Sequence, residues 1–413
     1  MTRTNWAGNV TYSAARLAEP TSIEELQELV RAEERVRVVG SRHCFNDIAD
    51  TPGVQVSLAR LRTDGPARVS DKAVRVPAWL RYGDLVPALR AEGVALANLA
   101  SLPHISVAGA VQTGTHGSGD RIGSLATQVS ALELVDGRGE LVRLARGDAD
   151  FDGAVVGLGA LGVLTQVELD VAPAVEVAQR VFEGVRLEAV LAELSRVTGA
   201  GDSVSMFTTW QDPAVVDQVW VKSAGEPDVD GIVAAGGRPA DGPRHPIAGI
   251  DPTPCTPQLG EFGPWYDRLP HFRLEFTPSV GAELQSEYMV PRTDAVAAIE
   301  AVARMAGRIS PLLFVCEIRT MAGDDLWLSP AYGSDTVGLH FTWKPDEAAV
   351  RALLPELEAA LPDTARPHWG KVFTMPGSEV ARRYPRWADF AGLLGRMDPD
   401  RRFANAYLSR LGL

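Results

Sequence analysis

Two segments in the first third of the chain are dominated by small residues, and they limit the folds that this chain can adopt. Residues 106–119 read SVAGAVQTGTHGSG, so the backbone there can approach a flat ligand closely. Residues 40–44 read GSRHC and follow a strand pattern over residues 35–39, which leaves backbone N–H groups available to a phosphate. Neither segment is a Gly-x-Gly-x-x-Gly fingerprint, and the match at residues 157–162 is weak evidence alone.

The elements around these segments predict a mixed α/β unit over residues 1 to about 172. Helical spacing follows a capping box formed by Thr21 and Glu24, or by Ser22 and Glu25. Asp136-Gly137 predicts a hairpin within residues 128–142. The other predicted elements are a helix over residues 23–30, strands over 35–39, 73–77 and 162–169, and a helix that starts near residue 82.

The pattern changes after residue 173, and the length of 413 residues itself favours two domains. Strands with polar alternation are predicted at 284–290, 312–320 and 336–343, with helices at 294–305 and 345–361. Residues 223–263 are rich in Gly, Pro and Asp, which indicates a long surface excursion or lid.

Composition excludes several classes of protein. Lys and Arg total 40 against 53 Asp and Glu, and this net charge of −13 opposes binding to nucleic acid or to anionic membranes. No apolar run is long enough for a membrane span, and no signal peptide is recognisable, so a cytoplasmic protein is expected. Three scattered cysteines predict neither a disulfide framework nor a metal site. Zinc-protease and α/β-hydrolase motifs are absent.

Polar residues two positions apart on the later strands indicate a polar cleft. Glu317 and Arg319 share one strand face, and so do His340 and Thr342, and Gln285 and Glu287. An acid and a base on one face can grip neighbouring hydroxyl groups, although a structural ion pair would give the same spacing. His340 and Thr342 could equally belong to an ordinary half-exposed strand, and Lys371 could be a solvated lysine.

Motifs along the chain resemble the vanillyl-alcohol-oxidase-like family of FAD enzymes, in particular its alditol oxidase and xylitol oxidase branch. They are NWAGN at 5–9, the His43 loop, LPHIS at 102–106, QSEY at 285–288, EIRT at 317–320, HFTW at 340–343, PHWGK at 367–371 and FANAYL at 403–408. The resemblance implies an α+β fold with an FAD-binding (PCMH-type) domain and a substrate-binding cap built on an antiparallel sheet with helices. We expect the FAD domain at 1–172, the cap at 173–374, and residues from about 375 to 413 packed back onto the FAD domain.

The resemblance also implies that His43 carries FAD covalently. Cys44 departs from the serine that is more usual beside this linkage. The other residues expected around FAD are Gly40, Ser41, Arg42, Cys44, Ser101, Ser106, Gly109, Thr113, Gly114, Thr115, His116 and Val163.

The implied reaction is oxidation of the C1 hydroxyl of an alditol such as xylitol or sorbitol, with dioxygen reduced to hydrogen peroxide. His340 is the expected base, because imidazole is poised near neutral pH, and Lys371 would steady negative charge on the substrate oxygen or on the reduced flavin. The residues expected to orient the polyol are Ser101, Gln285, Glu317, Arg319, Thr342 and Lys371. A sugar-lactone oxidase or dehydrogenase and a non-catalytic flavin- or sugar-binding protein are the alternatives. A monomer is expected, and no role is assigned to His245.

Overall fold

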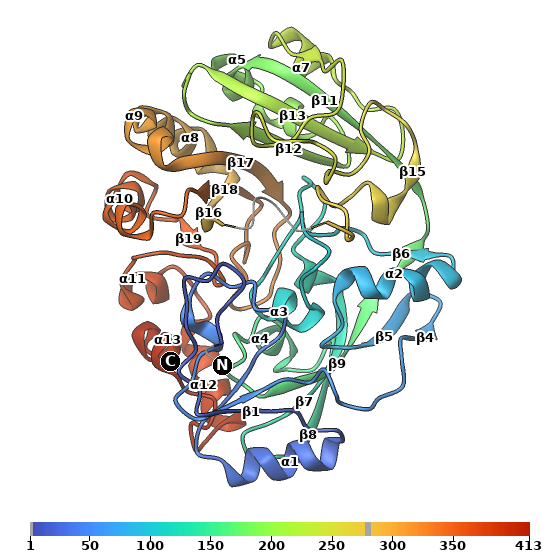
Figure 1. Cartoon of the computed structure of the whole chain (residues 1–413), viewed down its shortest axis with the longest axis vertical. Helices are drawn as coiled ribbons and strands as arrows, with labels where there is room; N and C mark the ends of the chain where they lie inside the picture. The colour runs from blue at the N-terminus through green and yellow to red at the C-terminus, as the bar shows by residue number, and fades with distance from the viewer. Residues whose placement is uncertain (1–2, 277–281) are drawn as a thin grey trace.

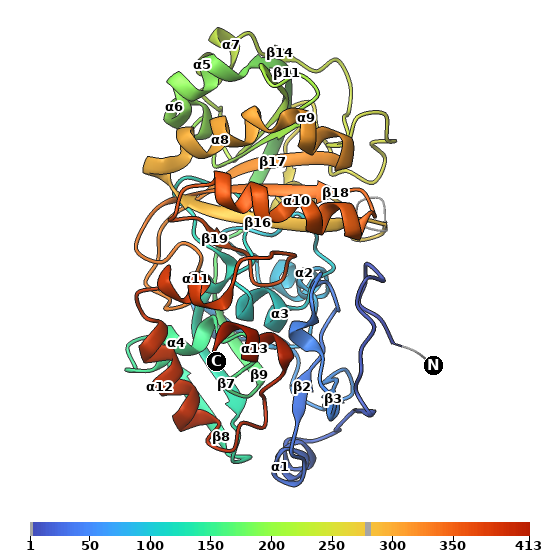
Figure 2. The same cartoon turned by 90° about the vertical axis from the view of Figure 1, so that its left-hand side faces the viewer.

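The computed structural model describes residues 3–276 and 282–413, and its elements form a lower and an upper body (Figure 1). The lower body holds the N-terminal strands and both chain ends, and the upper body holds a broad antiparallel sheet (Figures 1 and 2). Among the described residues, no helix combines the length and apolar character needed to cross a membrane.

The lower body contains a small parallel sheet and a larger antiparallel one. The parallel sheet has the order β1 (Arg16–Ala18), β3 (Val54–Val56) and β2 (Val36–Val38). The antiparallel sheet has the order β4 (Ala67–Ser70), β5 (Ala73–Pro77), β9 (Val163–Asp170), β7 (Val129–Val135) and β8 (Leu141–Ala145). Strand β6 (Val94–Ala95) pairs with β10 (Ala172–Pro173). The helices of this part are α1 (Ile23–Ala32), α2 (Tyr82–Ala91), α3 (Val107–Gln112), α4 (Phe151–Val155), η1 (Asp47–Ala49) and η2 (Leu125–Gln128).

The upper body is one antiparallel sheet with helices packed on it. Its order is β14 (Arg238–Pro239), β11 (Glu176–Arg186), β13 (Val215–Ser223), β12 (Ser203–Thr208), β17 (Leu313–Met321), β18 (Thr336–Trp343), β16 (Leu284–Pro291) and β19 (Arg366–Pro367), and β15 (Gly263–Pro264) pairs with β11. The helices here are α5 (Leu187–Ala192), α6 (Leu194–Thr198), α7 (Asp230–Ala234), α8 (Ala295–Arg304), α9 (Ala306–Ile309), α10 (Glu347–Ala360), η3 (Trp265–Asp267), η4 (Arg292–Asp294) and η5 (Ser310–Leu312).

Alternation along the central strands separates a dry face from a polar face. Ile318, Leu339, Phe341 and Trp343 are buried in one hydrophobic cluster with residues of α5, α8 and α10. Successive strand residues point to opposite faces, so the intervening polar side chains point away from this core. The polar face is therefore turned toward the lower body.

Most of the predicted elements are present close to the predicted bounds, because each has a clear period or turn signal. Strands β5 and β18 coincide with the predicted ranges, and the Asp136-Gly137 hairpin joins β7 to β8. At α1 the cap is Ser22, whose Oγ accepts from the N–H of Glu25 at 3.2 Å, so the alternative based on Thr21 and Glu24 is wrong. The Glu25 carboxylate accepts from the N–H of Thr21 at 2.7 Å.

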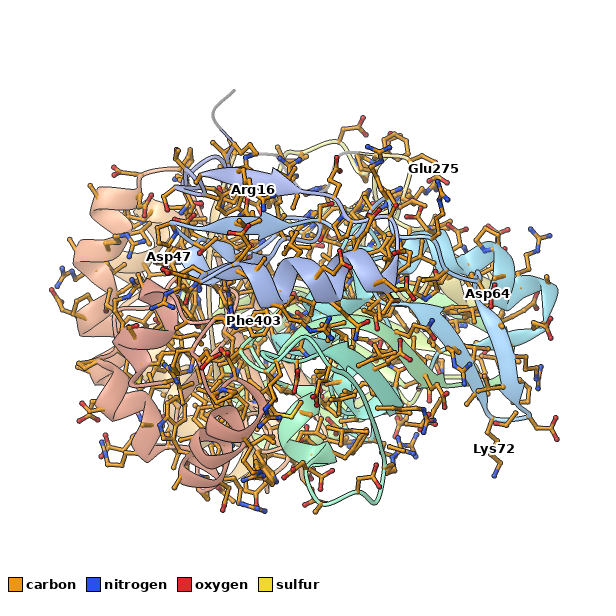
Figure 3. The ribbon with its side chains drawn as sticks, turned by 90° about the horizontal axis from the view of Figure 1, so that it is seen from below. Arg16, Asp47, Asp64, Lys72, Glu275 and Phe403 are labelled. Atoms are coloured by element: carbon orange, nitrogen blue, oxygen red, sulfur yellow. The ribbon has the colours of Figure 1, made fainter. Side chains whose placement is uncertain are left out.

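The chain returns twice to the lower body after the upper sheet has begun. Trp327 and Leu328, in the connection between β17 and β18, are buried in the lower core. Helices α11 (Gly377–Arg382), α12 (Trp387–Met397) and α13 (Ala406–Leu411) lie beside it (Figure 2), with residues such as Phe390 and Leu408 in the same core. Phe403 packs with residues of α1 and the parallel sheet (Figure 3).

Residues 223–263 form a largely exposed excursion along the edge of the upper sheet, as their composition predicts. It is more than a surface loop, however, because His245, Ile247 and Cys255 within it are buried. Ile247 and Cys255 pack with Phe207 and Trp220 of the sheet. The excursion therefore closes one side of the space between the two bodies.

Candidate active site

A cavity lies between the two bodies and collects most of the residues singled out from the sequence. From the lower body it is lined by Gly40, Ser41, Arg42, His43, Cys44, Ser101, Ser106, Gly109, Thr113, Thr115 and His116. From the polar face above it is lined by Gln285, Glu317, Arg319, His340, Thr342 and Lys371. The fold thus brings two groups of residues together that lie more than a hundred positions apart in the chain.

Two predicted cofactor residues, Gly114 and Val163, do not line this cavity. Gly114 has a φ of +63°, and an added Cβ there would lie 2.9 Å from Cδ of Pro330, so it faces the β17–β18 connection instead. Val163 is buried in the hydrophobic cluster around α1, while its neighbours Gly162 and Leu164 line the cavity.

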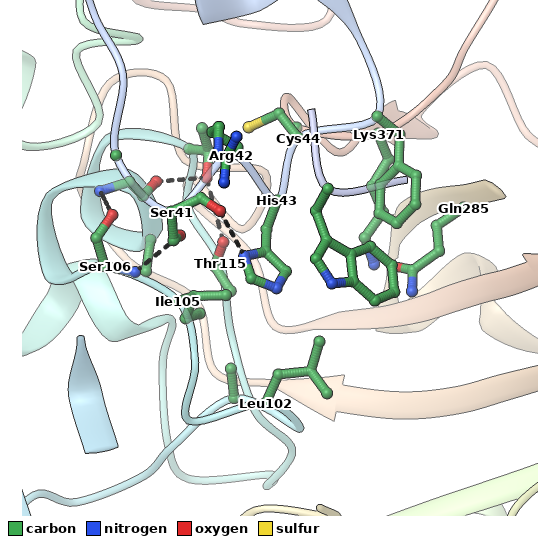
Figure 4. Close-up of a pocket in the computed structure, with 18 of the residues that line it drawn as sticks. Ser41, Arg42, His43, Cys44, Leu102, Ile105, Ser106, Thr115, Gln285 and Lys371 are labelled. Carbon is green, nitrogen blue, oxygen red and sulfur yellow. Dashed lines mark hydrogen bonds between the residues drawn. The ribbon is translucent and has the colours of Figure 1, made fainter. Parts of the chain in front are cut away.

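The two small-residue segments, residues 40–44 and 106–119, contact each other beside the cavity at Ser41 and Ser106 (Figure 4). The N–H of Ser106 donates to Oγ of Ser41 at 3.1 Å, and Oγ of Ser106 caps α3 by accepting from the N–H of Gly109 at 3.4 Å. A Cβ on Gly40 would lie 2.5 Å from Oγ of Ser106. Glycine is therefore required at position 40 for the loops to approach this closely.

His43 is held as a neutral imidazole at the edge of the cavity (Figure 4). Burial, and then the charge of His104, lowers the pKa of His43 to about 4. The carbonyl oxygen of Ser41 lies 3.1 Å from Nδ1 and can only accept, so Nδ1 carries the proton. Nε2 is buried and has no hydrogen-bond partner within residues 3–276 and 282–413, and the Trp6 ring stacks on the imidazole at a centroid distance of 5.3 Å. The ring is thus oriented and keeps an unprotonated nitrogen.

Glu317 is the central acceptor on the polar face. It accepts from Nε2 of His271 at 2.9 Å and from Nδ1 of His340 at 3.4 Å, and Nη1 of Arg319 lies 3.6 Å away. Burial alone would raise the pKa of this carboxyl group, but Arg319 and His271 hold it well below its usual range. The carboxylate is therefore ionised, and it can only accept hydrogen bonds.

The ionised Glu317 carboxylate fixes the tautomer of His340. Since the carboxylate of Glu317 accepts from Nδ1, the unprotonated nitrogen of His340 is Nε2, which is buried and has no hydrogen-bond partner in the described part of the chain. Burial, and then the charge of Lys371, lowers the pKa of His340 to about 4. The imidazole is neutral at physiological pH.

A second buried carboxylate, Glu287, supports the cationic residues of the site. Its Oε1 accepts from Nη2 of Arg319 at 2.9 Å, its Oε2 accepts from Nζ of Lys371 at 2.6 Å, and Nε2 of His116 lies 3.2 Å from Oε1. Burial would raise the pKa of Glu287, yet Arg319 and Lys371 hold it well below its usual range. Ser101 joins the network, since its Oγ accepts from Nη1 of Arg319 at 3.3 Å.

Several residues of the site were given no role from the sequence. The period of two placed Glu287 on the same strand face as Gln285, but no role was assigned to it. His368 lies within the PHWGK segment but was given no role, and it lines the cavity, as does Leu158 of the Gly157–Gly162 segment. His245 and His271 also line it, and both belong to a region without a regular period that could have placed them.

The fold and the lower half of the cavity define an FAD-binding flavoprotein. The family described as "FAD binding domain" matches residues 14–145. Among solved structures, a solvent-stable cholesterol oxidase aligns with a TM-score of 0.76 and 15% identity, covering 100% of this chain and 97% of that one. A cholesterol oxidase from B. sterolicum aligns with a TM-score of 0.77 and 16% identity, covering 99% and 96%. At these identities the likeness shows the fold.

Full-length sequence relatives show the particular family. An alditol oxidase from a Streptomyces species is 46% identical over 412 residues, covering 99% of this chain and 98% of that protein. An L-gulono-1,4-lactone dehydrogenase from Mycobacterium tuberculosis is 30% identical, covering 98% of each. The family described as "D-arabinono-1,4-lactone oxidase" matches residues 282–411. The chain belongs to the family of FAD-dependent oxidoreductases that contains the alditol oxidase and these sugar-lactone enzymes.

Proposed function

We propose that this protein oxidises the C1 hydroxyl of a small alditol, such as xylitol or sorbitol, to the aldose, and reduces dioxygen to hydrogen peroxide. The observation that carries the proposal is the ionised Glu317 carboxylate, which lies against both His340 and Arg319 on the polar face of the cavity. The 46% identity to an alditol oxidase over nearly the whole chain supports the same reaction.

The polar face offers matched partners for a row of hydroxyl groups. Glu317 accepts, Arg319 donates, and Thr342, Ser101 and Gln285 can do both. Each hydroxyl of an alditol also donates and accepts, so neighbouring hydroxyls can be held by pairs of these residues. Substrates without such hydroxyls would leave buried polar groups unpaired, which disfavours them strongly.

We assign His340 as the base that takes the hydroxyl proton. Its Nε2 is unprotonated because Glu317 accepts from Nδ1, and Glu317 would also stabilise the imidazolium after proton transfer. An imidazole whose pKa is lowered to about 4 is a weak base, so the substrate oxygen must be made more acidic. The ammonium of Lys371 and the guanidinium of Arg319 supply positive charge for this purpose, since both line the same cavity.

The residues of the lower body fit FAD. Gly40 packs directly on Ser106, and the small residues beside them line the cavity. The buried Nε2 of His43 has no hydrogen-bond partner among the residues that the structure describes. We propose that a ring nitrogen of His43 forms the covalent bond to the flavin, which keeps the cofactor at the site. When bound, FAD supplies the acceptor for the hydride of the substrate carbon and the route of the electrons to dioxygen.

We further propose that residues 1–172 and about 375–413 form the FAD-binding part, and that residues 173–374 form the substrate-binding part. Shared burial of Phe390 and Leu408 in the lower core supports this division, although Trp327 and Leu328 cross it. The monomeric state stays a prediction. The cytoplasmic location stays a prediction.

The test is peroxide release by the FAD-loaded protein with xylitol and sorbitol, compared with a galactonolactone and a gulonolactone. Release with the alditols supports the proposal, and release with the lactones alone would assign a sugar-lactone oxidase. Bound flavin that no alditol or lactone reduces would indicate a binding protein. His340→Ala should then slow flavin reduction about 10²- to 10⁴-fold with a smaller effect on substrate affinity. Equal losses in both would count against the base role.

A further inference from the structure

We propose that Lys222 and His271 form a buried pair that positions the Glu317 carboxylate, and through it His340, for alditol oxidation. Neither residue belongs to the polar groups that grip the substrate on the strands β16, β17 and β18. The inference rests on the proposed function, because it assigns the pair a task in the same reaction.

Lys222 lies near the end of β13, and only 1% of the residue is exposed. Its ammonium nitrogen lies 2.5 Å from the carbonyl oxygen of Leu269, 3.0 Å from that of Pro270 and 3.1 Å from Nδ1 of His271. Burial lowers the pKa of Lys222 from 10.5 to about 7, so below that pH the side chain is an ammonium group. An ammonium group has three protons to donate and no lone pair, so these three contacts use all of them. Nδ1 of His271 must therefore accept, and the imidazole proton lies on Nε2.

This tautomer is the one that Glu317 requires. Nε2 of His271 donates to Oε1 of Glu317 at 2.9 Å, and that leaves Oε2 for Nδ1 of His340 at 3.4 Å and for Nη1 of Arg319 at 3.6 Å. The opposite tautomer of His271 would place two acceptors against each other. Lys222 thus selects the proton position on His271, and the ionised Glu317 selects it on His340.

The imidazole of His271 is also fixed in orientation. Phe207 and Trp220 pack edge-on against it at centroid distances of 5.5 Å and 5.3 Å, with interplanar angles of 69° and 80°. The residue is 6% exposed. Since the ring cannot turn within this packing, the hydrogen bond to Glu317 keeps one direction, and the carboxylate cannot rotate away from His340 without losing it.

In its ammonium form Lys222 also adds positive charge behind Glu317, whereas His271 is neutral. The groups that face Glu317 are Arg319, His271 and His340, and Lys222 stands behind His271. Lys222 itself faces Glu317 and Cys255, and burial raises the pKa of that thiol to about 12, so it is uncharged. On the far side, Glu287 lies behind Arg319 and Lys371 lies near His340. Removing the Lys222 charge should therefore raise the pKa of Glu317.

Gln179 provides a matched control. It is the register partner of Lys222 on the neighbouring strand β11, it is fully buried, and its Nε2 lies 3.3 Å from the carbonyl oxygen of Thr256 and 3.2 Å from that of Pro257. It therefore ties part of the same connecting region to the sheet by buried hydrogen bonds, and none of its side-chain hydrogen bonds to the described residues reaches His271 or Glu317.

The experiment compares His271→Gln, His271→Leu, Lys222→Met and Gln179→Leu in the FAD-loaded protein. A glutamine at 271 can accept from Lys222 through its oxygen and donate to Glu317 through its amide nitrogen, whereas leucine can do neither. Flavin content and Tm report folding. Anaerobic flavin reduction by xylitol gives the reduction rate and the apparent affinity. The pH dependence of kcat/KM is followed from pH 9 down to the pKa of His340 at about 4, so that the acidic limb is included.

We expect His271→Leu to lower the flavin reduction rate about 10- to 100-fold, and His271→Gln to recover most of that loss. Lys222→Met should move the acidic limb of the kcat/KM profile to higher pH, while Gln179→Leu should keep the wild-type profile whatever it does to Tm. Equal losses in the two His271 variants, or a wild-type rate in His271→Leu, would overturn the proposal. If Lys222→Met does not retain FAD, the comparison of His271→Gln with His271→Leu tests the proposal. A wild-type protein whose flavin no alditol reduces would instead refute the proposed function.

Discussion

Oε2 of Glu287 lies 2.6 Å from Nζ of Lys371, and the Glu287 side chain is completely buried. The pair explains how a lysine comes to line the cavity at 9% exposure, because the carboxylate behind it offsets the cost of removing an ammonium group from water. Burial lowers the pKa of Lys371 and Glu287 acts against that shift. Glu287 therefore stabilises the positive charge of Lys371 at the cavity wall.

Glu287→Gln should reduce the free energy of unfolding by about 3–5 kcal/mol, since Lys371 loses its buried partner and Arg319 keeps only the more distant contact with Glu317. The measurement is urea unfolding of the FAD-loaded protein at pH 7. Glu226→Gln is the control, because Glu226 pairs with Arg180 at 3.2 Å with 81% of its side chain exposed. That change should cost less than about 1 kcal/mol. Similar costs for the two variants would mean that Glu287 is not needed as a charge.

His43→Ala should convert tightly held flavin into flavin that acid releases. The expected result follows from the oriented, unprotonated imidazole of His43, which the variant removes. The measurement is acid precipitation, followed by the mass of the peptide that contains position 43. Cys44→Ser is the control and should keep the flavin adduct, because the thiol of Cys44 has its pKa raised to about 11 by burial and is a poor nucleophile. Flavin that stays in the His43→Ala pellet would place the bond elsewhere.

Gly40→Ala should lower the fraction of purified protein that carries FAD, because the new Cβ would press on Ser106 and separate the two loops. An added Cβ would lie 2.5 Å from Oγ of Ser106 and 3.4 Å from its Cβ. Removing that hydroxyl in the double variant Gly40→Ala, Ser106→Ala should therefore restore part of the binding. The measurement is flavin content after purification. Gly65→Ala is the control, since nothing lies within 4 Å of a Cβ there. A double variant no better than Gly40→Ala would contradict the contact.

The protein should lose stability as pH falls from about 6.5 toward 4. The pKa values of His271 and His340 are lowered from 6.5 to about 4 by burial, so the unfolded chain takes up these protons before the folded one does. Each group then costs up to about 1.4 kcal/mol per pH unit in that window, and nothing further below it.

Urea unfolding of the FAD-loaded protein at pH 7.0 and 5.5 measures this effect, with an expected loss of about 2–3 kcal/mol from the two histidines. His271→Gln removes one of the titrating groups, so the loss should shrink by the share of one histidine, about 1 kcal/mol, in that variant. The other histidines with lowered pKa values keep their contributions. A stability that does not change between the two pH values would show that these imidazoles are not held neutral by the fold.

Local signals in the sequence predicted much of this molecule. The period of two over residues 336–343 and the Asp136-Gly137 turn predicted elements that the structure contains. The same period placed Glu317 and Arg319 on one face, and small residues marked the loops that meet at Ser41 and Ser106. These features depend on neighbours a few positions away, so they can be read without the fold.

Contacts between residues far apart in the chain could not be predicted from these local signals. His271 and Lys222 come from a loop and from a strand without a motif, yet they meet behind Glu317. Glu287 pairs with Arg319 and Lys371 because the fold places β16, β17 and the segment after β19 side by side. Val163 was expected beside FAD from the resemblance, but its side chain packs in a hydrophobic core.

The sequence by itself determined the strands and turns, the face on which each polar side chain lies, and the family to which the chain belongs. The tertiary structure alone decided which charges are buried together, and hence the low pKa values of Glu317 and His340 and the tautomers of the two imidazoles beside Glu317. The physical reason is that periodicity arises from the local backbone, whereas desolvation and pairing depend on every residue that the fold brings within a few ångströms.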